Sequence, residues 1–184
     1  MTVKKTGGKG YAAEEALGNY FRSIGYFVMR GIPLCYRGYE VTDVDLWLYL
    51  KPNTISSERA CVDIKRKKTP QAMERILWAK GLKNILGTDR AIVATSDNRA
   101  ETREFAAAHN VGILQSDFLQ RVIKNYSDSV ERIPTEQFHE LLKEPCIVDT
   151  DLNWKAYHDF LKGRLITNLN FDTCNYYLDE IGFI

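Results

Sequence analysis

The stretch RACVDIKRKK, residues 59–68, combines a strand pattern with charges that a core strand seldom carries. Val62 and Ile64 suit the buried face of a strand, because side chains alternate between its two faces. Asp63 and Lys65 then share the opposite face. The stretch therefore places an acid and a base side by side on a strand that enters a hydrophobic core.

A second strand with the same alternation precedes this stretch. The segment YEVTDVDLWLYL, residues 39–50, is rich in β-branched and aromatic residues and places Asp43 and Asp45 on one face. A turn sequence at 51–58 separates the two strands, which predicts an antiparallel pair. If their apolar faces pack together, the polar faces also meet, and two or three carboxylates gather with Lys65 on one patch of the sheet.

Hydrophobic spacing and turn residues predict the remaining elements of an α/β fold. Thr69 and Pro70 form a helix start, Gly87 is a helix stop, and an irregular loop is expected after residue 30. The order strand, helix, strand over 90–114 favours a parallel crossover, so we expect a central mixed sheet flanked by helices. Helices are predicted over 11–25, 71–86 and 100–110, and strands over 27–30, 90–96 and 111–114.

The 184 residues, 45% hydrophobic and 27% charged, are ordinary for a soluble globular protein. We expect a compact core over 9–124 and a helical C-terminal extension over 125–184. No apolar run approaches the roughly 20 residues that span a bilayer, and the start lacks the apolar core of a signal peptide, so we expect a cytoplasmic protein without a membrane partner. The four scattered cysteines predict neither a disulfide framework nor a zinc site.

The first half of the chain is basic. Residues 1–90 hold 16 Lys and Arg against 9 Asp and Glu, whereas the remainder carries a net charge of −6. Such a split favours a polyanion partner, although solvated lysines contribute to it. The side chains expected to contact a DNA phosphate backbone, without reading its sequence, are Arg66, Lys67, Lys68, Arg75, Lys80 and Lys83.

The acids on the two neighbouring strands predict a divalent metal site. Carboxylates brought close together repel one another unless a cation lies between them. Magnesium prefers oxygen ligands and usually keeps several waters, so Asp45, Asp63 and a backbone carbonyl would form a partial ligand shell. A metal lowers the pKa of its water, and Lys65 is expected to orient or deprotonate that water. The alternative is an exposed strand edge that carries a salt bridge.

Glu14 in the first helix, Asp45 in the second strand and Asp63-Ile64-Lys65 resemble the PD-(D/E)xK nuclease superfamily, whose members share a restriction-endonuclease-like fold. The resemblance implies a Mg²⁺-dependent endonuclease that hydrolyses DNA phosphodiester bonds with a metal-activated water, with Mn²⁺ able to substitute. It also implies that Asp45, Asp63, Glu14 and the Ile64 carbonyl bind the metal and that Lys65 is the catalytic lysine.

Residues 9–123 are also similar to the Mrr-type restriction endonucleases and the Holliday junction resolvases. The similarity lies in GYAAEEALGNYFRSIGYFV, residues 10–28, and AIVATSDNRAETREFAAAHNVGILQSDFLQRV, residues 91–122. Gln71 occupies a place where some relatives keep a functional glutamine, and a surface role is the alternative.

Three points depart from this pattern or leave a choice open. Valine precedes Asp45 where the family has proline. Asp43 competes with Asp45, which lies deeper in its strand, and Glu15 competes with Glu14, which is spaced with the packed face of its helix. These competitors do not change the kind of site that is expected.

Two other functions stay open on the sequence alone. One is a catalytically inactive DNA-binding or assembly protein that keeps the nuclease fold. The other is an unrelated α/β interaction module whose acids are surface charge. If the chain cleaves both strands of a duplex, two active sites are needed, which predicts a two-fold homodimer.

Overall fold

The computed structural model describes residues 9–37, 39–65, 71–126, 138, 140, 153–167, 170 and 172–176. The chain divides into two compact units, one formed by residues 1–31 and 44–129 and the other by residues 32–43 and 130–184. The end of the first unit lies near the predicted boundary at 124–125. The segment 32–43, which the sequence places in the core, belongs to the second unit.

A five-stranded mixed sheet has the order β1-β2-β3-β4-β5. Strands β2 and β3 are antiparallel, with Leu46 opposite Val62. Strand β3 runs parallel to β4, and β4 runs parallel to β5. The predicted antiparallel pair and the predicted parallel crossover are therefore both confirmed. The strands are β1 Phe27–Tyr36, β2 Tyr39–Leu50, β3 Glu58–Lys65, β4 Arg90–Thr95 and β5 Val111–Leu114.

The prediction of an irregular loop after residue 30 is wrong, because β1 continues to Tyr36. Gly31 and Pro33 suggested a break, yet Ile32 and Leu34 alternate as buried residues along the strand. Pairing with β2 supplies the backbone hydrogen bonds that make the longer strand stable. This pairing is a tertiary contact that local turn residues do not reveal.

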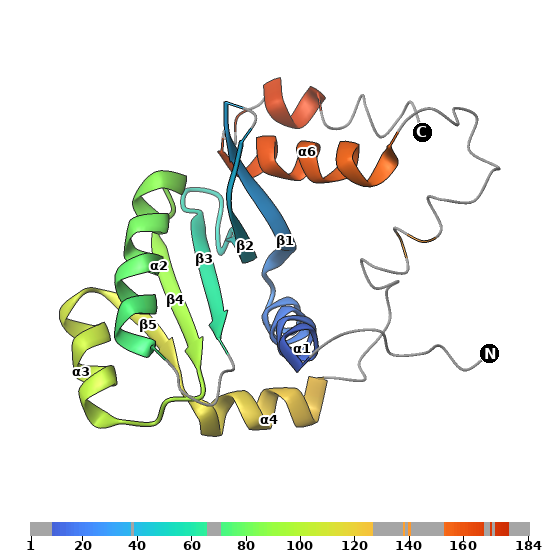
Figure 1. The fold of residues 1–184 in the computed structure, drawn as a ribbon. Helices are drawn as coiled ribbons and strands as arrows, with labels where there is room; N and C mark the ends of the chain where they lie inside the picture. The colour runs from blue at the N-terminus through green and yellow to red at the C-terminus, as the bar shows by residue number, and fades with distance from the viewer. Residues whose placement is uncertain are drawn as a thin grey trace, which may run out of the picture. The chain divides into compact units, whose positions relative to one another are not determined.

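Helices cover both faces of the sheet in the first unit. Figure 1 shows α2 and α3 on one side of β3, β4 and β5, and α1 and α4 on the other. In the hydrophobic core, Leu17 of α1 and Leu119 of α4 pack with Val62 and Ile64 of β3. On the opposite face, α2 buries a stripe at helical spacing that includes Ile76 and Leu82. The helices are α1 Lys9–Ser23, α2 Ala72–Leu86, α3 Ala100–Ala108 and α4 Ser116–Tyr126.

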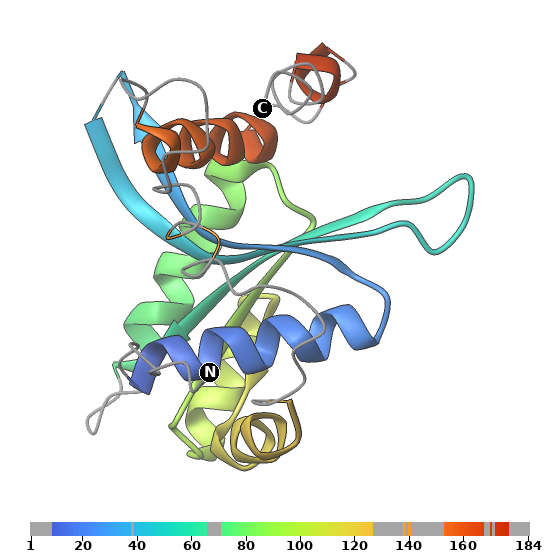
Figure 2. The same cartoon turned by 90° about the vertical axis from the view of Figure 1, so that its right-hand side faces the viewer.

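Both faces of β2 and β3 are buried beside α2, which the alternating pattern did not predict. Trp47 lies on the face assigned to polar residues, yet it is only 1% exposed, like Leu46 and Leu48 on the other face. Asp63 is buried as well. A sheet whose strands include a parallel crossover is covered on both sides, so the expected polar patch lies under a helix. Beyond this covered region, the connection between β2 and β3 extends as a long hairpin (Figure 2).

The second unit contains one long described helix, α6 Trp154–Thr167, which agrees with the helix predicted in the C-terminal extension. Leu161 and Ile166 are buried. Gly163 lies so close to β1 that a Cβ atom there would be 3.1 Å from the Pro33 carbonyl oxygen.

Within the described ranges, none of the helices combines the length and the apolar character needed to cross a membrane.

Substitution by alanine is expected to change stability in opposite directions at Gly81, inside α2, and at Gly87, just after it. Gly81 is an exposed helical residue whose Cβ would meet no atom within 4 Å, so Gly81→Ala should raise the free energy of unfolding by about 0.5–1 kcal/mol. Gly87 ends the helix with φ at 60°, and Gly87→Ala should lower the free energy of unfolding by about 1 kcal/mol. Urea denaturation measures both changes. Equal shifts in the same direction would contradict this description of the helix end.

Candidate active site

The candidate site forms where β2 and β3 separate. The last pair of the ladder joins Leu46 to Val62, and the next residues on the two strands are Asp45 and Asp63. The Oδ2 atom of Asp45 accepts a hydrogen bond of 2.6 Å from the main-chain N–H of Ile64. The carboxylate of Asp45 thus satisfies a backbone donor that the strand pair leaves open, and this contact holds Asp45 against the strand that carries Asp63.

Asp63 forms a bidentate ion pair with Arg75 in the first turns of α2. The Nε atom of Arg75 donates to Oδ2 of Asp63 at 2.8 Å, and Nη2 donates to Oδ1. The side chain of Asp63 is 6% exposed, so its charge is nearly removed from water. A buried carboxylate needs such a partner, because an unpaired charge in this position is strongly destabilising.

Arg75 also interacts electrostatically with Asp45. Burial lowers the pKa of Arg75 and the negative charge of Asp45 opposes this shift, while the guanidinium stays protonated. Its guanidinium carbon lies 5.8 Å from the centre of the Trp78 ring. The cation expected near these two carboxylates is therefore supplied by the chain itself, and the sequence assigned Arg75 to phosphate contacts instead.

Glu14, the predicted helix ligand, pairs with Arg30 of β1. Its Oε2 atom lies 3.4 Å from Nη1 of Arg30, and Oε2 of Glu15 lies 3.4 Å from Nε of the same guanidinium. The side chain of Glu14 is 25% exposed and that of Glu15 is 14% exposed, so burial does not favour Glu14 over its neighbour. Both glutamates neutralise one buried arginine.

The oxygen atoms near the end of β3 suit a hard cation, although the carboxylates of Asp45 and Asp63 already bind other groups of the chain. The carboxylates of Asp45 and Asp63 and the carbonyl of Ile64 are the ligand types that Mg²⁺ prefers. Among the residues that the structure describes, no three or more His, Cys, Asp or Glu side chains lie close enough to hold a metal. An ion at Asp63 would therefore compete with the guanidinium of Arg75 for the carboxylate oxygens.

Lys65 and Gln71 line the same cavity, next to the ion pair. The cavity has a volume of about 300 Å³ and is also lined by Glu74, Arg75 and Trp78. Lys65 ends β3, and Gln71 precedes α2 without a side-chain bond that caps the helix. The sequence predicted functions for Lys65 and Gln71 but not for Glu74 and Trp78. Gln71, Glu74 and Trp78 are spaced by three and four residues, which places them on one face of a helix. This spacing could have identified Glu74 and Trp78 from the sequence.

The other predicted site residues differ in their surroundings. Asp43 is exposed, whereas Asp45 is half-buried, which favours Asp45 as the site carboxylate. Lys80 is exposed on α2 with its Nζ atom 3.4 Å from Nδ1 of His109, and Lys83 is half-buried on the same helix. The predicted phosphate contacts Arg66, Lys67 and Lys68 lie outside the described residues.

No family model matches this chain, and no curated protein matches it in sequence. The resemblance to PD-(D/E)xK nucleases rests on the quoted motifs and stays a prediction.

The Asp63–Arg75 pair predicts an asymmetric response to substitution. Arg75→Met should lower the free energy of unfolding by about 3 kcal/mol, because it leaves the Asp63 carboxylate buried without a partner. The double variant Asp63→Asn, Arg75→Met removes both charges and should recover most of this loss. Urea denaturation of the single and double variants forms a double-mutant cycle. Additive effects of the two substitutions would contradict the coupling.

Proposed function

We propose that this chain is a Mg²⁺-dependent endonuclease that hydrolyses DNA phosphodiester bonds and has a restriction-endonuclease-like fold of the Mrr and junction-resolvase type. The main support is the position of Asp45 and Asp63 at the point where β2 and β3 separate, with Lys65 two residues beyond Asp63. The mixed sheet flanked by helices is compatible with such a fold. Cleavage of both strands of a duplex would need two copies, so a homodimer is part of the proposal.

Each residue near the end of β3 has a role in this proposal. Asp45, Asp63 and the carbonyl of Ile64 would hold the metal, and Glu14, which does not form a three-carboxylate group with them, would act through a water. When bound, Mg²⁺ supplies Lewis-acid activation of water and neutralises charge that develops on the phosphate. Lys65 positions the attacking water from the wall of the adjacent cavity.

Arg75 would have a second role in this proposal, as a ligand of the substrate phosphate. The guanidinium is 26% exposed in a cavity that Lys65 and Gln71 also line, so it already reaches a space open to substrate. A guanidinium binds phosphate oxygens in the same bidentate manner as a carboxylate. Arg75 would therefore exchange Asp63 for the phosphate of the substrate. Gln71 would donate its amide to that phosphate from the start of α2.

The role of Lys65 is tested by DNA cleavage. Lys65→Ala should reduce Mg²⁺-dependent cleavage at least about 100-fold while leaving thermal unfolding unchanged, since Lys65 ends its strand and is not part of the core. Lys51→Ala removes the same charge from an exposed position and serves as the matched control. Linear, branched and modified DNA should be compared as substrates. Full activity of the Lys65 variant would show that the catalytic lysine is wrongly assigned.

The second candidate function is a DNA-binding or assembly protein that keeps the fold without catalysis. The observation in its favour is the Arg75–Asp63 ion pair, because a guanidinium on Asp63 meets the electrostatic need that a metal would otherwise meet. In this case the pair is permanent, and Asp45 binds the main chain of Ile64 without holding a metal.

Metal binding separates the two functions. A catalytic site should bind Mn²⁺, measured by the electron paramagnetic resonance of the free ion, and Asp63→Asn should abolish the binding. Arg75→Met should bind Mn²⁺ more tightly than the unaltered chain, because the competing cation is gone. Glu101→Gln removes an exposed acid of α3 and is the control for non-specific charge. Absence of binding in both the unaltered chain and Arg75→Met would favour the non-catalytic protein.

A further inference from the structure

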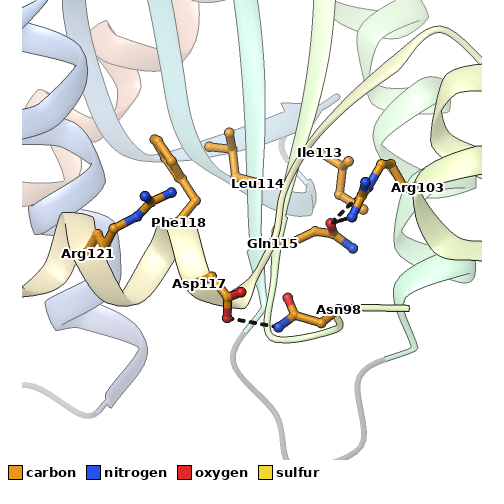
Figure 3. A pocket seen from close by; sticks show the side chains of 8 residues that line it. All are labelled: Asn98, Arg103, Ile113, Leu114, Gln115, Asp117, Phe118 and Arg121. Carbon is orange, nitrogen blue, oxygen red and sulfur yellow. Dashed lines mark hydrogen bonds between the residues drawn. The ribbon is translucent and has the colours of Figure 1, made fainter. Parts of the chain in front are cut away.

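A second and larger cavity lies beyond the end of β5, within the first unit. Its volume is about 490 Å³, and its lining combines two arginines with apolar and aromatic side chains. Figure 3 shows Arg103 and Arg121 on opposite sides of this cavity, with Phe118 beside Arg121 and Leu114 between the two sides. Ile113 adds a further apolar group. The volume falls within the range of about 300–1,000 Å³ that is typical of small-molecule sites.

Hydrogen bonds fix the polar rim of this cavity. Gln115 accepts hydrogen bonds through Oε1 from Nε and Nη2 of Arg103, at 3.1 and 2.9 Å, and its Nε2 donates to the Arg99 carbonyl at 3.2 Å. Asn98 donates through Nδ2 to Oδ1 of Asp117 at 3.0 Å. The rim is therefore built from side chains whose orientation other contacts determine, which lowers the entropic cost of binding a ligand.

Arg121 differs from these rim residues. Within the part of the chain that the structure describes, no hydrogen bond or ion pair engages its guanidinium, although Asp117 lies four residues earlier on the same helix. All five of its N–H donors are available to a ligand. Arg103 keeps its Nη1 donors in addition to the two bonds to Gln115. The cavity thus offers cationic donors in a fork geometry next to an aromatic ring and two aliphatic side chains.

This combination selects the chemistry of the ligand. Guanidinium groups bind phosphate through paired hydrogen bonds. An inorganic anion would leave the apolar side chains and most of the volume unused, and a wholly apolar ligand would cover two exposed arginines without giving their guanidinium groups a partner. A ligand that joins a phosphate to a planar ring uses both parts, because aromatic side chains stack on nucleobases.

We infer that this cavity binds one nucleotide unit, with its phosphate at Arg121 and Arg103 and its base against Phe118. Oδ1 of Asn98 and Oδ2 of Asp117, which do not take part in the hydrogen bond between these two side chains, accept hydrogen bonds from the base or the sugar. The nucleotide is either a free mononucleotide or one residue of a nucleic-acid strand. The chemistry of recognition is the same in both cases.

The position of the cavity relative to Lys65 supports a nucleic-acid strand, rather than a free mononucleotide, as the source of the bound nucleotide. Lys65 pairs with Thr95, and Ala94 pairs with Leu114, so the ends of β3 and β5 lie at one edge of the sheet, two strands apart. Two strand spacings are about 10 Å, which equals about three nucleotide steps of about 3.4 Å along one strand. This link rests on the proposed nuclease function, since it takes Lys65 to mark the scissile phosphate. Binding in the cavity itself does not require cleavage.

The test measures binding without divalent ions, so that no cleavage occurs. Methyl NMR signals of Ile113 and Leu114 should shift on titration with thymidine monophosphate and should shift much less with inorganic phosphate. A labelled short oligothymidylate, followed by fluorescence anisotropy, should bind at least about tenfold more weakly to Arg121→Gln. Lys124→Gln removes one charge from the same helix at an exposed position outside the cavity and should change affinity only slightly.

Each outcome decides the inference. Equal methyl shifts with phosphate alone, or equal affinities of Arg121→Gln and Lys124→Gln for both nucleotide and oligonucleotide, would overturn it. Shifts with the mononucleotide but none with the oligonucleotide would support a site for free nucleotides. Nucleotide binding that persists in a chain without Mg²⁺-dependent cleavage would uphold this cavity while the nuclease proposal fails.

Discussion

The burial of the Asp63 carboxylate is the constraint on which the first unit depends. Strand β3 carries an acid into a region covered by helices on both faces, and an uncompensated charge there would cost several kcal/mol. Arg75 meets this requirement from α2, and the bidentate contact fixes the start of that helix over the end of β3. Apolar packing holds α2 along its whole length, from the buried Ala72 at its start through residues such as Ile76 to Leu86 at its end. The ion pair adds a polar contact to the first turns of the helix, beside the cavity that Lys65 and Gln71 line.

The same ion pair explains why two different functions fit one arrangement of side chains. Two carboxylates near one another are stabilised by a positive charge, which either a guanidinium or a metal ion can supply. Chemistry distinguishes them, because a metal activates water and a guanidinium does not. A guanidinium with 26% of its side chain exposed keeps a path by which it can turn toward solvent or phosphate. Whether a divalent ion can displace Arg75 from Asp63 is thus the property that would separate the two proposed functions.

Local patterns predicted the parts of this structure that depend on local periodicity. The two-residue alternation of β2 and β3 placed Asp45 and Asp63 together, and the strand–helix–strand order over 90–114 predicted the parallel crossover. The pairing of Asp63 with Arg75 was missed, because twelve residues separate them and no short pattern joins a strand acid to a helix arginine. The contact between Glu14 and Arg30 and the length of β1 were missed for the same reason. Each depends on which elements meet in space, whereas the sequence pattern reports only which face a residue occupies.

The parallel strands explain why both cavities lie along one edge of the sheet. Ligand sites of open α/β sheets gather outside the carboxyl ends of their parallel strands, and Lys65, Thr95 and Leu114 end three such strands. The middle of this edge, at the end of β4, has a structural role. Asp97, just after β4, accepts hydrogen bonds from Arg99 and Thr102. The hydrogen bonds from Arg99 hold the pKa of Asp97 below its ordinary value, so the charged carboxylate stays committed to the turn that begins α3. The edge is therefore divided into a structural centre and two flanking cavities, and a strand of nucleic acid laid along it would meet cationic groups at both ends.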